Sequence, residues 1–178
     1  EYVTIASAGN ATDFGDMTQA VYLAAACASP TRGMIGGGNT GSTRVNRLEY
    51  ITIASTGNGT DTGDLVSDTD GPASCSSSTR GLWCGGDINT GTVNKIEYQT
   101  IASGGNSSDF GDLTNTLRYG GAGCSEIRAL IAGEFSGNAN GIDFVTIAST
   151  GNATDFGDLL NNETNGLACA STAHGGLQ

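Results

Sequence analysis

The stretch Thr4-Ile-Ala-Ser-Ala-Gly-Asn-Ala-Thr-Asp-Phe-Gly-Asp16 decides the architecture, because it is repeated. Close copies begin at Thr52, Thr100 and Thr146. An aromatic residue precedes every copy, at Tyr2, Tyr50, Tyr98 and Phe144. A period of about 48 residues is typical of one supersecondary unit whose apolar face is buried by its neighbours. We therefore expect a single repeat domain over residues 1–178, with copies starting near Glu1, Glu49, Glu97 and Asp143.

Each repeat contains segments with the composition of short strands, and the second copy shows them most clearly. Runs of β-branched, aromatic or small residues alternate there with glycine-rich and polar turns. The expected strands are Ala73–Ser77, Gly81–Gly86, Val93–Ala102 and Phe110–Thr114, with a polar loop at Asp87–Gly91. Four antiparallel strands per repeat form the pattern of a propeller blade. No 3.6-residue apolar period is present, so we expect essentially no helix.

The glycine pairs Gly37-Gly38 and Gly85-Gly86, followed by Tyr50 and Tyr98, resemble those of kelch repeats. The tryptophan that kelch repeats carry after the tyrosine is missing, and three copies place a phenylalanine further along, at Phe14, Phe110 and Phe156. The string from Thr146 to Leu159 also resembles repeats in tail-fibre and virion structural proteins of marine bacteriophages. The resemblance implies an all-β, kelch-like β-propeller, a virion or extracellular location and a role in recognition.

The two ends of the chain supply complementary parts of one repeat. The N-terminus corresponds to a third and fourth strand, and Ala168–Gln178 corresponds to a first and second strand. Together they would complete a fourth blade and close a ring without free sheet edges. We therefore expect Val3–Ser7 to pair with a strand near the C-terminus, in the same chain or in a neighbouring copy. The alternative is that the chain is part of a larger ring or of a longer fibre.

The net charge of −11 arises mainly from the repeat. Eight of the 18 acidic residues are its paired aspartates: Asp13, Asp16, Asp61, Asp64, Asp109, Asp112, Asp155 and Asp158. We expect all eight to be structural turn residues, with the second of each pair accepting backbone N–H bonds. Only seven basic residues are present, and they are scattered, which argues against nucleic acid as a partner. No apolar run approaches the roughly 18 residues of a membrane span.

The repeated aspartates and the single histidine bear on metals and catalysis. Asn10, Asp13 and Asp16 offer three oxygen-bearing side chains, fewer than the roughly six oxygens that calcium takes. We expect no cofactor, with calcium as the alternative. One histidine, His174, excludes a His-paired nucleophile and a multi-histidine metal site in practice. Because no acid–base pair stands out from the repeat either, we expect no enzyme.

Cysteines, arginines and sequons recur at equivalent repeat positions. Cys27, Cys75, Cys124 and Cys169 share one position, which a small buried residue on a first strand explains. A two-residue turn would place Cys75 opposite Cys84, leaving free thiols or a disulfide open. Arg32, Arg80 and Arg128 also share a position, and we expect them to pair with scaffold acids. Sequons such as those at Asn10 and Asn58 follow from the turn motif, and we expect no glycan.

Recognition chemistry is expected where the copies differ, which is in the loops after the Gly-Asp motif and after the glycine pair. Candidate binding residues in these loops are Tyr22, Asp68, Asp70, Tyr119, Phe135, Asn161 and Asn162. The expected function is a non-enzymatic virion-surface or tail-fibre module that binds a host receptor or surface glycan. The alternative is a structural repeat protein that acts as a spacer or self-assembles into a fibre. Its partners would then be other virion proteins or, in a homo-oligomer, copies of itself.

Overall fold

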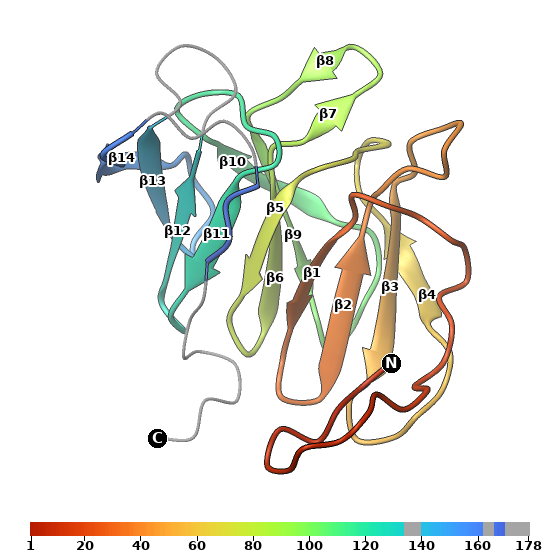
Figure 1. The fold of residues 1–178 in the computed structure, drawn as a ribbon. Helices are drawn as coiled ribbons and strands as arrows, with labels where there is room; N and C mark the ends of the chain where they lie inside the picture. The colour runs from red at the N-terminus through yellow and green to blue at the C-terminus, as the bar shows by residue number, and fades with distance from the viewer. Residues whose placement is uncertain (134–139, 162–165, 170–178) are drawn as a thin grey trace.

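The computed structural model describes residues 1–133, 140–161 and 166–169, and strands dominate them (Figure 1). The first sheet contains β1 (Ala25–Ala28), β2 (Arg32–Gly36), β3 (Arg47–Thr52) and β4 (Thr60–Asp64). The second contains β5 (Ala73–Ser76), β6 (Arg80–Cys84), β9 (Lys95–Thr100) and β10 (Ser108–Asp112). The third contains β11 (Gly121–Cys124), β12 (Arg128–Ala132), β13 (Gly141–Thr146) and β14 (Thr154–Asp158). A small hairpin pairs β7 (Asp87–Ile88) with β8 (Gly91–Thr92).

Each of these repeats forms one antiparallel four-stranded sheet, which confirms the all-β prediction. No helix occurs in the part of the chain that the structure describes. The four strands of the second repeat lie where the sequence predicts them, to within a few residues. The expected polar loop at Asp87–Gly91 instead contains the hairpin β7–β8, in which Thr92 donates a hydrogen bond to the Asp87 carboxylate (2.5 Å). The described strands do not form a closed ring, so the propeller remains a prediction.

The first strands of the three sheets lie side by side at the centre of the molecule (Figure 1). Ser76 in β5 makes two bonds to Ala28 in β1: its hydroxyl donates to the carbonyl (2.8 Å) and accepts from the N–H (3.0 Å). On the other side, the Cys124 thiol in β11 donates to the Ser76 carbonyl (2.9 Å). Small side chains on these strands allow this close approach, which places the sheets around a shared centre.

The apolar core lies between neighbouring sheets. One buried cluster, between the first and second sheets, includes Met34, Leu48 and Trp83. Trp83 packs directly on Gly36, where an added Cβ would lie 2.4 Å from the indole nitrogen. A larger cluster, between the second and third sheets, includes Leu82, Ile96, Phe110, Ile131 and Ile147. The repeated apolar positions therefore stabilise contacts between repeats, as a repeat architecture requires.

The last strands of the first and second sheets are joined to the next repeat by the same set of hydrogen bonds, which we call the junction contacts. Between the first two sheets, Gly105 N–H donates to the Thr62 carbonyl (2.7 Å) and Asp64 N–H to Asn106 Oδ1 (3.1 Å). Val66 N–H also donates to the Glu97 carboxylate (2.8 Å). At the next junction, Gly151 N–H donates to the Phe110 carbonyl (2.7 Å) and Asp112 N–H to Asn152 Oδ1 (3.0 Å). Thr114 N–H donates to the Asp143 carboxylate (2.8 Å).

Residues 1–16 form half of a repeat and join the first sheet in the same way. Tyr2 pairs with Thr12 through two backbone bonds of 2.9 Å. Gly57 N–H donates to the Phe14 carbonyl (2.7 Å), and Asp16 N–H donates to Asn58 Oδ1 (3.0 Å). Within the described residues, Val3–Ser7 pairs with no C-terminal strand, and the predicted pairing stays untested. The segment 170–178, which contains the expected second strand, lies outside them.

The arginines at the start of β2 and β6 join neighbouring sheets. Arg32 Nη1 donates to the carbonyls of Ile101 (2.7 Å) and Ala102 (3.0 Å). Its guanidinium also stacks on Tyr50, 4.1 Å from the ring centroid. Arg80 repeats this arrangement toward the third sheet. The predicted pairing of these arginines with acidic side chains is therefore wrong, because carbonyls in the Thr-Ile-Ala-Ser turn lie within reach and have no strand partner.

The turn hydrogen bonds differ from the prediction in their acceptor. The first aspartate of a pair accepts from the glycine two residues later: Asp13 from Gly15 (3.2 Å), Asp61 from Gly63 (3.0 Å) and Asp155 from Gly157 (3.0 Å). The second aspartates, for which this role was predicted, are exposed: Asp16, Asp64, Asp112 and Asp158. The first three of these contribute their backbone N–H to the junction contacts.

The hairpin between β5 and β6 has a longer turn than the sequence suggested. Ser77 Oγ accepts from the N–H groups of Thr79 (3.3 Å) and Arg80 (3.1 Å), which closes the turn around the serine. The resulting register places Cys75 opposite Leu82 and Cys84 opposite Ala73. The predicted facing of Cys75 and Cys84 is therefore wrong, and both cysteines are free thiols.

Candidate functional site

The divergent loops that the structure describes leave from one end of the sheets, which we call the loop face (residues 17–24, 39–46, 65–72, 87–94, 113–120 and 159–161). In an antiparallel sheet ordered 1-2-3-4, the connection between strands 2 and 3 starts at the same end as the connection leaving strand 4. The repeated Thr-Ile-Ala-Ser turns leave from the opposite end. The hairpin β7–β8 projects from the loop face (Figure 1).

Backbone bridges join the two sets of divergent loops. Tyr22 pairs with Asn39, and Asp70 pairs with Asp87. Asn39 also pairs with Arg44 within its own loop. These bridges hold the loops that follow Gly-Asp against the loops that follow the glycine pair, so the loop face is an ordered surface rather than a set of separate segments.

Five polar side chains form a connected group on this face, which we call the rim cluster: Asn39, Arg44, Asp70, Asp87 and Arg118. The Asp70 carboxylate accepts from Asn39 Nδ2 (2.9 Å) and forms an ion pair with Arg44 Nε (3.0 Å). Arg118 Nη1 donates to Asp87 Oδ2 (2.6 Å), and Arg44 Nη2 lies 3.9 Å from the same oxygen. The cluster thus links four loops, which lie around the first and second sheets.

The two acidic side chains of the rim cluster are buried, which is unusual for carboxylates on a loop surface. The side chain of Asp70 is 4% exposed and that of Asp87 is 9% exposed. Asp70 Oδ1 has no hydrogen-bond partner among the described residues. A buried acceptor without a donor is unfavourable by about 1–3 kcal/mol, so a water molecule or a hydroxyl of a ligand would stabilise it.

Competing effects set the pKa of Asp87. Burial alone raises the pKa of this carboxyl group, but hydrogen bonds from Thr92 and Arg118 and the charges of Arg118 and Arg44 outweigh burial. The pKa is therefore held below the ordinary value of 3.8. Asp87 remains a carboxylate throughout the neutral and mildly acidic range.

We predict that the Asp87→Asn variant has a flatter acid profile of stability than the wild type. Because the folded pKa lies below the unfolded value, the carboxylate stabilises the fold above about pH 4 and this contribution is lost as the pH falls through the folded pKa. Urea denaturation at about pH 6 and about pH 3 measures the difference. The exposed Asp68→Asn variant is the control. Equal loss of stability in the wild type and Asp87→Asn would contradict the prediction.

Four residues at one repeat position form a chain of backbone bonds beside the rim cluster. Leu23, Gly71, Tyr119 and Gly166 all have positive φ, at 57°, 63°, 56° and 76°. The N–H of Gly71 donates to the Leu23 carbonyl (2.8 Å) and the N–H of Tyr119 to the Gly71 carbonyl (2.8 Å). The N–H of Gly166 donates to the Tyr119 carbonyl (2.9 Å). The Tyr119 ring covers Gly71, where a Cβ would lie 2.3 Å from a ring carbon. Tyr119 is thus placed for packing more than for stacking on a ligand.

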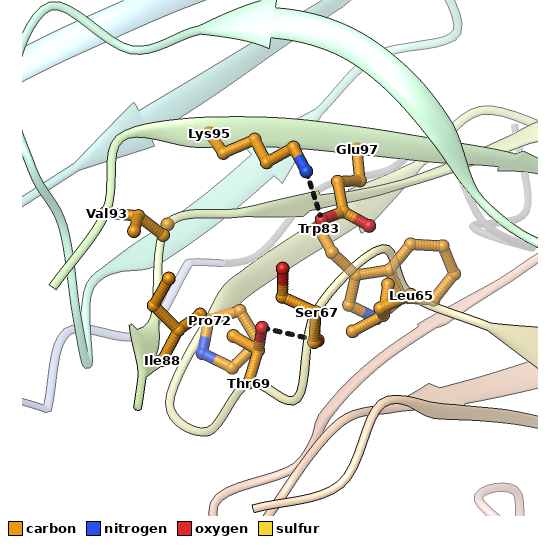
Figure 2. Close-up of a pocket in the computed structure, with 10 residues that line it drawn as sticks. Leu65, Ser67, Thr69, Pro72, Trp83, Ile88, Val93, Lys95 and Glu97 are labelled. Atoms are coloured by element: carbon orange, nitrogen blue, oxygen red, sulfur yellow. Dashed lines mark hydrogen bonds and ion pairs between the residues drawn. The ribbon is translucent and has the colours of Figure 1, made fainter. Parts of the chain in front are cut away.

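A pocket lies between the first and second sheets, next to Trp83 (Figure 2). Its walls include Leu65, Pro72 and Trp83, and the ion pair between Lys95 and Glu97 (3.3 Å) lies on one side. The cavity volume is about 30 Å³, which holds a water molecule or two. It is too small for a sugar ring, so a large ligand would bind to the loop surface rather than inside this pocket.

A second cavity of about 210 Å³ lies at the centre, between β1, β5 and β11. Four thiols line it, those of Cys27, Cys75, Cys124 and Cys169. Burial raises the pKa of Cys27 to about 12 and also raises that of Cys84. Protonated thiols are poor nucleophiles and poor metal ligands. Within the described residues, no three His, Cys, Asp or Glu side chains are grouped to hold a metal ion.

The predicted binding residues differ in how exposed they are. Tyr22 is 52% exposed, Asp68 and Asn161 are exposed, and Asp70 is buried in the rim cluster. Phe135 and Asn162 lie outside the described residues. The rim-cluster residues that sequence reasoning missed are Asn39, Arg44, Asp87 and Arg118. Charges of both signs in the divergent loops were the available signal, but only the fold shows that these loops meet.

No protein-family model matches the chain, and no curated protein matches it. The described residues also contain no helix suited to crossing a membrane. The function is therefore inferred from the geometry of the loop face.

Proposed function

We propose that this protein is a non-enzymatic binding module, a kelch-like propeller of the virion surface or tail-fibre type, that binds a host receptor or surface glycan through its loop face. One observation carries the proposal: both divergent loop sets lie at the same end and are joined by backbone bridges, while the repeated turns lie at the other end. A rigid frame with varied loops on one face is typical of recognition proteins. The virion setting is supported only by the resemblance of the repeats.

The chemistry of the loop face favours a ligand rich in hydroxyl groups. Tyr22 exposes about half of its side chain next to Asn39, which suits stacking on a sugar ring. The rim cluster adds partly exposed arginines as donors, and the exposed Asp68 adds a carboxylate acceptor. Such a mixture of acceptors, donors and an aromatic face binds sugars better than it binds apolar peptides.

The structural-repeat alternative predicts a different behaviour. A spacer or fibre segment needs complementary ends but no conserved chemistry on its loops, and exposed apolar residues such as Ile5 and Phe156 occur at the two ends of the described array. Loss of loop-face chemistry would leave such a protein fully functional.

We predict that Tyr22→Ala and Asp68→Ala together reduce glycan or host-cell binding at least tenfold, because they remove an exposed aromatic face and an exposed acceptor. Binding of the purified chain to a glycan array and to host cells measures this effect. Asp109→Ala, which removes an exposed carboxylate outside the loop face, is the matched control. Equal binding by all variants, or no binding by the wild type at high concentration, would favour the structural alternative.

A further inference from the structure

The geometry points to a fourth junction, in which residues 5–11 of the chain dock on the open side of the third sheet of the same molecule. This inference rests on the propeller frame of the proposed function but not on any ligand. It assigns an interaction surface, formed by Arg128, Phe156, Asp158 and Leu160, and its occupant, the N-terminal half-repeat.

The open side of the third sheet presents the groups that are paired at the other junctions. Phe110 in β10 is 2% exposed because the following repeat covers it, whereas its equivalent Phe156 in β14 is 53% exposed. The Arg128 guanidinium stacks on Phe144, 4.5 Å from the ring centroid, as Arg80 stacks on Tyr98. Among the described residues, however, no carbonyl accepts a bond from the Arg128 guanidinium. This surface is therefore complementary to a Thr-Ile-Ala-Ser turn.

Residues 5–11 contain the equivalent turn, and its isoleucine is exposed. Ile101 and Ile147, whose carbonyls accept bonds from Arg32 and Arg80, are each 1% exposed. Ile5, at the same repeat position, is 99% exposed. By equivalence with the existing junctions, Arg128 would donate to the Ile5 carbonyl and Asp158 N–H to Asn10 Oδ1. The Phe156 carbonyl would accept from Gly9 N–H.

The occupant belongs to the same molecule because the fourth position lies next to the first sheet. Gly166 already continues the chain of positive-φ residues from Tyr119. Cys169, three residues later, lines the same central cavity as Cys27 of β1. The first strands of successive repeats are therefore arranged around this cavity, and the fourth of them lies toward the first sheet. Residues 14–18 already make junction contacts with that sheet. Each complete repeat uses its turn for one neighbour and its last strand for the other, so residues 5–11 remain available for the third sheet.

The test compares one substitution at three isoleucines. If the fourth junction forms, Ile5→Thr lowers the melting temperature by about 5 °C or more, close to the fall caused by Ile147→Thr, which replaces a buried ethyl group with a hydroxyl. Ile127→Thr is the matched control, because Ile127 is 70% exposed and other repeats have threonine there, at Thr31 and Thr79. Differential scanning calorimetry at two protein concentrations and light scattering provide the readout.

Each outcome decides the inference. A fall with Ile5→Thr that is independent of concentration in a monomer supports docking within one molecule. A fall that depends on concentration and accompanies dimers or filaments overturns it in favour of a second copy as occupant. No fall with Ile5→Thr, alongside a clear fall with Ile147→Thr, overturns the junction itself. Glycan binding is not part of this readout, so its presence or absence tests the proposed function separately.

A second pair of variants tests the same surface from the side of the third sheet. Gly111 and Gly157 have the same φ of 144°, but an added Cβ at Gly111 would lie 2.4 Å from the Gly151 carbonyl oxygen, while Gly157 has open space. If residues 5–11 dock there, Gly157→Ala lowers the melting temperature as much as Gly111→Ala. A fall with Gly157→Ala no larger than the fall with Gly41→Ala, which has backbone strain alone, would overturn the inference.

Discussion

Gly111→Ala is expected to lower the free energy of unfolding by about 2–5 kcal/mol, the largest effect of any single change considered. The backbone φ of Gly111 is 144°, a conformation that strains residues with a side chain. The added Cβ would also lie 2.4 Å from the Gly151 carbonyl oxygen, which belongs to the next repeat. That contact is with backbone, so the junction itself must move to relieve it.

Urea denaturation followed by fluorescence and circular dichroism measures this change. The control is Gly41→Ala: Gly41 has a φ of 97° but nothing within 4 Å of an added Cβ, so only backbone strain of about 1–2 kcal/mol applies. Gly63→Ala, at the equivalent position one repeat earlier and 2.3 Å from the Gly105 carbonyl oxygen, should resemble Gly111→Ala. If Gly111→Ala proves no more destabilising than Gly41→Ala, the repeats are packed less closely than the structure shows.

Arg80→Ala is expected to destabilise the protein by about 2–4 kcal/mol. Arg80 Nη1 donates to the carbonyls of Ile147 and Ala148, each at 3.0 Å, and the guanidinium stacks on Tyr98 at 4.7 Å. Truncation leaves two carbonyls of the third repeat without their donor and removes the stacking. The effect combines a loss within the second sheet with a loss across the junction.

Arg80→Lys should recover only part of this stability, because an ammonium group keeps the charge but not the planar stacking surface. Lys95→Ala is the control: its ion pair with Glu97 has a partly exposed lysine, so about 1 kcal/mol or less is expected. Chemical denaturation of the four proteins gives the ranking. An Arg80→Ala effect as small as that of Lys95→Ala would show that the carbonyls are satisfied equally well by water.

Much of the fold follows from local pattern in the sequence. The recurrence of Thr-Ile-Ala-Ser and of the Gly-Asp turn reveals the period, and short β-branched runs between glycines predict the strands of the second repeat. These features depend on propensity and turn chemistry within a few residues, which a single sequence displays directly. The loop face was also partly predictable, because loops that differ between copies stand out against a repeated background.

The partners of individual side chains were not predictable in the same way. Arg32 and Arg80 were expected to meet carboxylates and instead meet carbonyls of the next repeat, and Cys84 lies opposite Ala73 rather than Cys75. The rim cluster joins Asn39 to Asp70 and Asp87 to Arg118, residues that are far apart in the chain and differ in type. Register, junction geometry and burial decide such contacts, and these arise only when separate repeats pack together.

The sequence by itself determined that this protein is a repeat protein with four-stranded antiparallel units, because hydrophobic pattern and glycine turns act locally. Only the tertiary structure decided which groups meet at the junctions and on the loop face. Contacts between repeats depend on where each sheet comes to lie against the next, and the position of Ile5, exposed where Ile101 and Ile147 are buried, is visible only there.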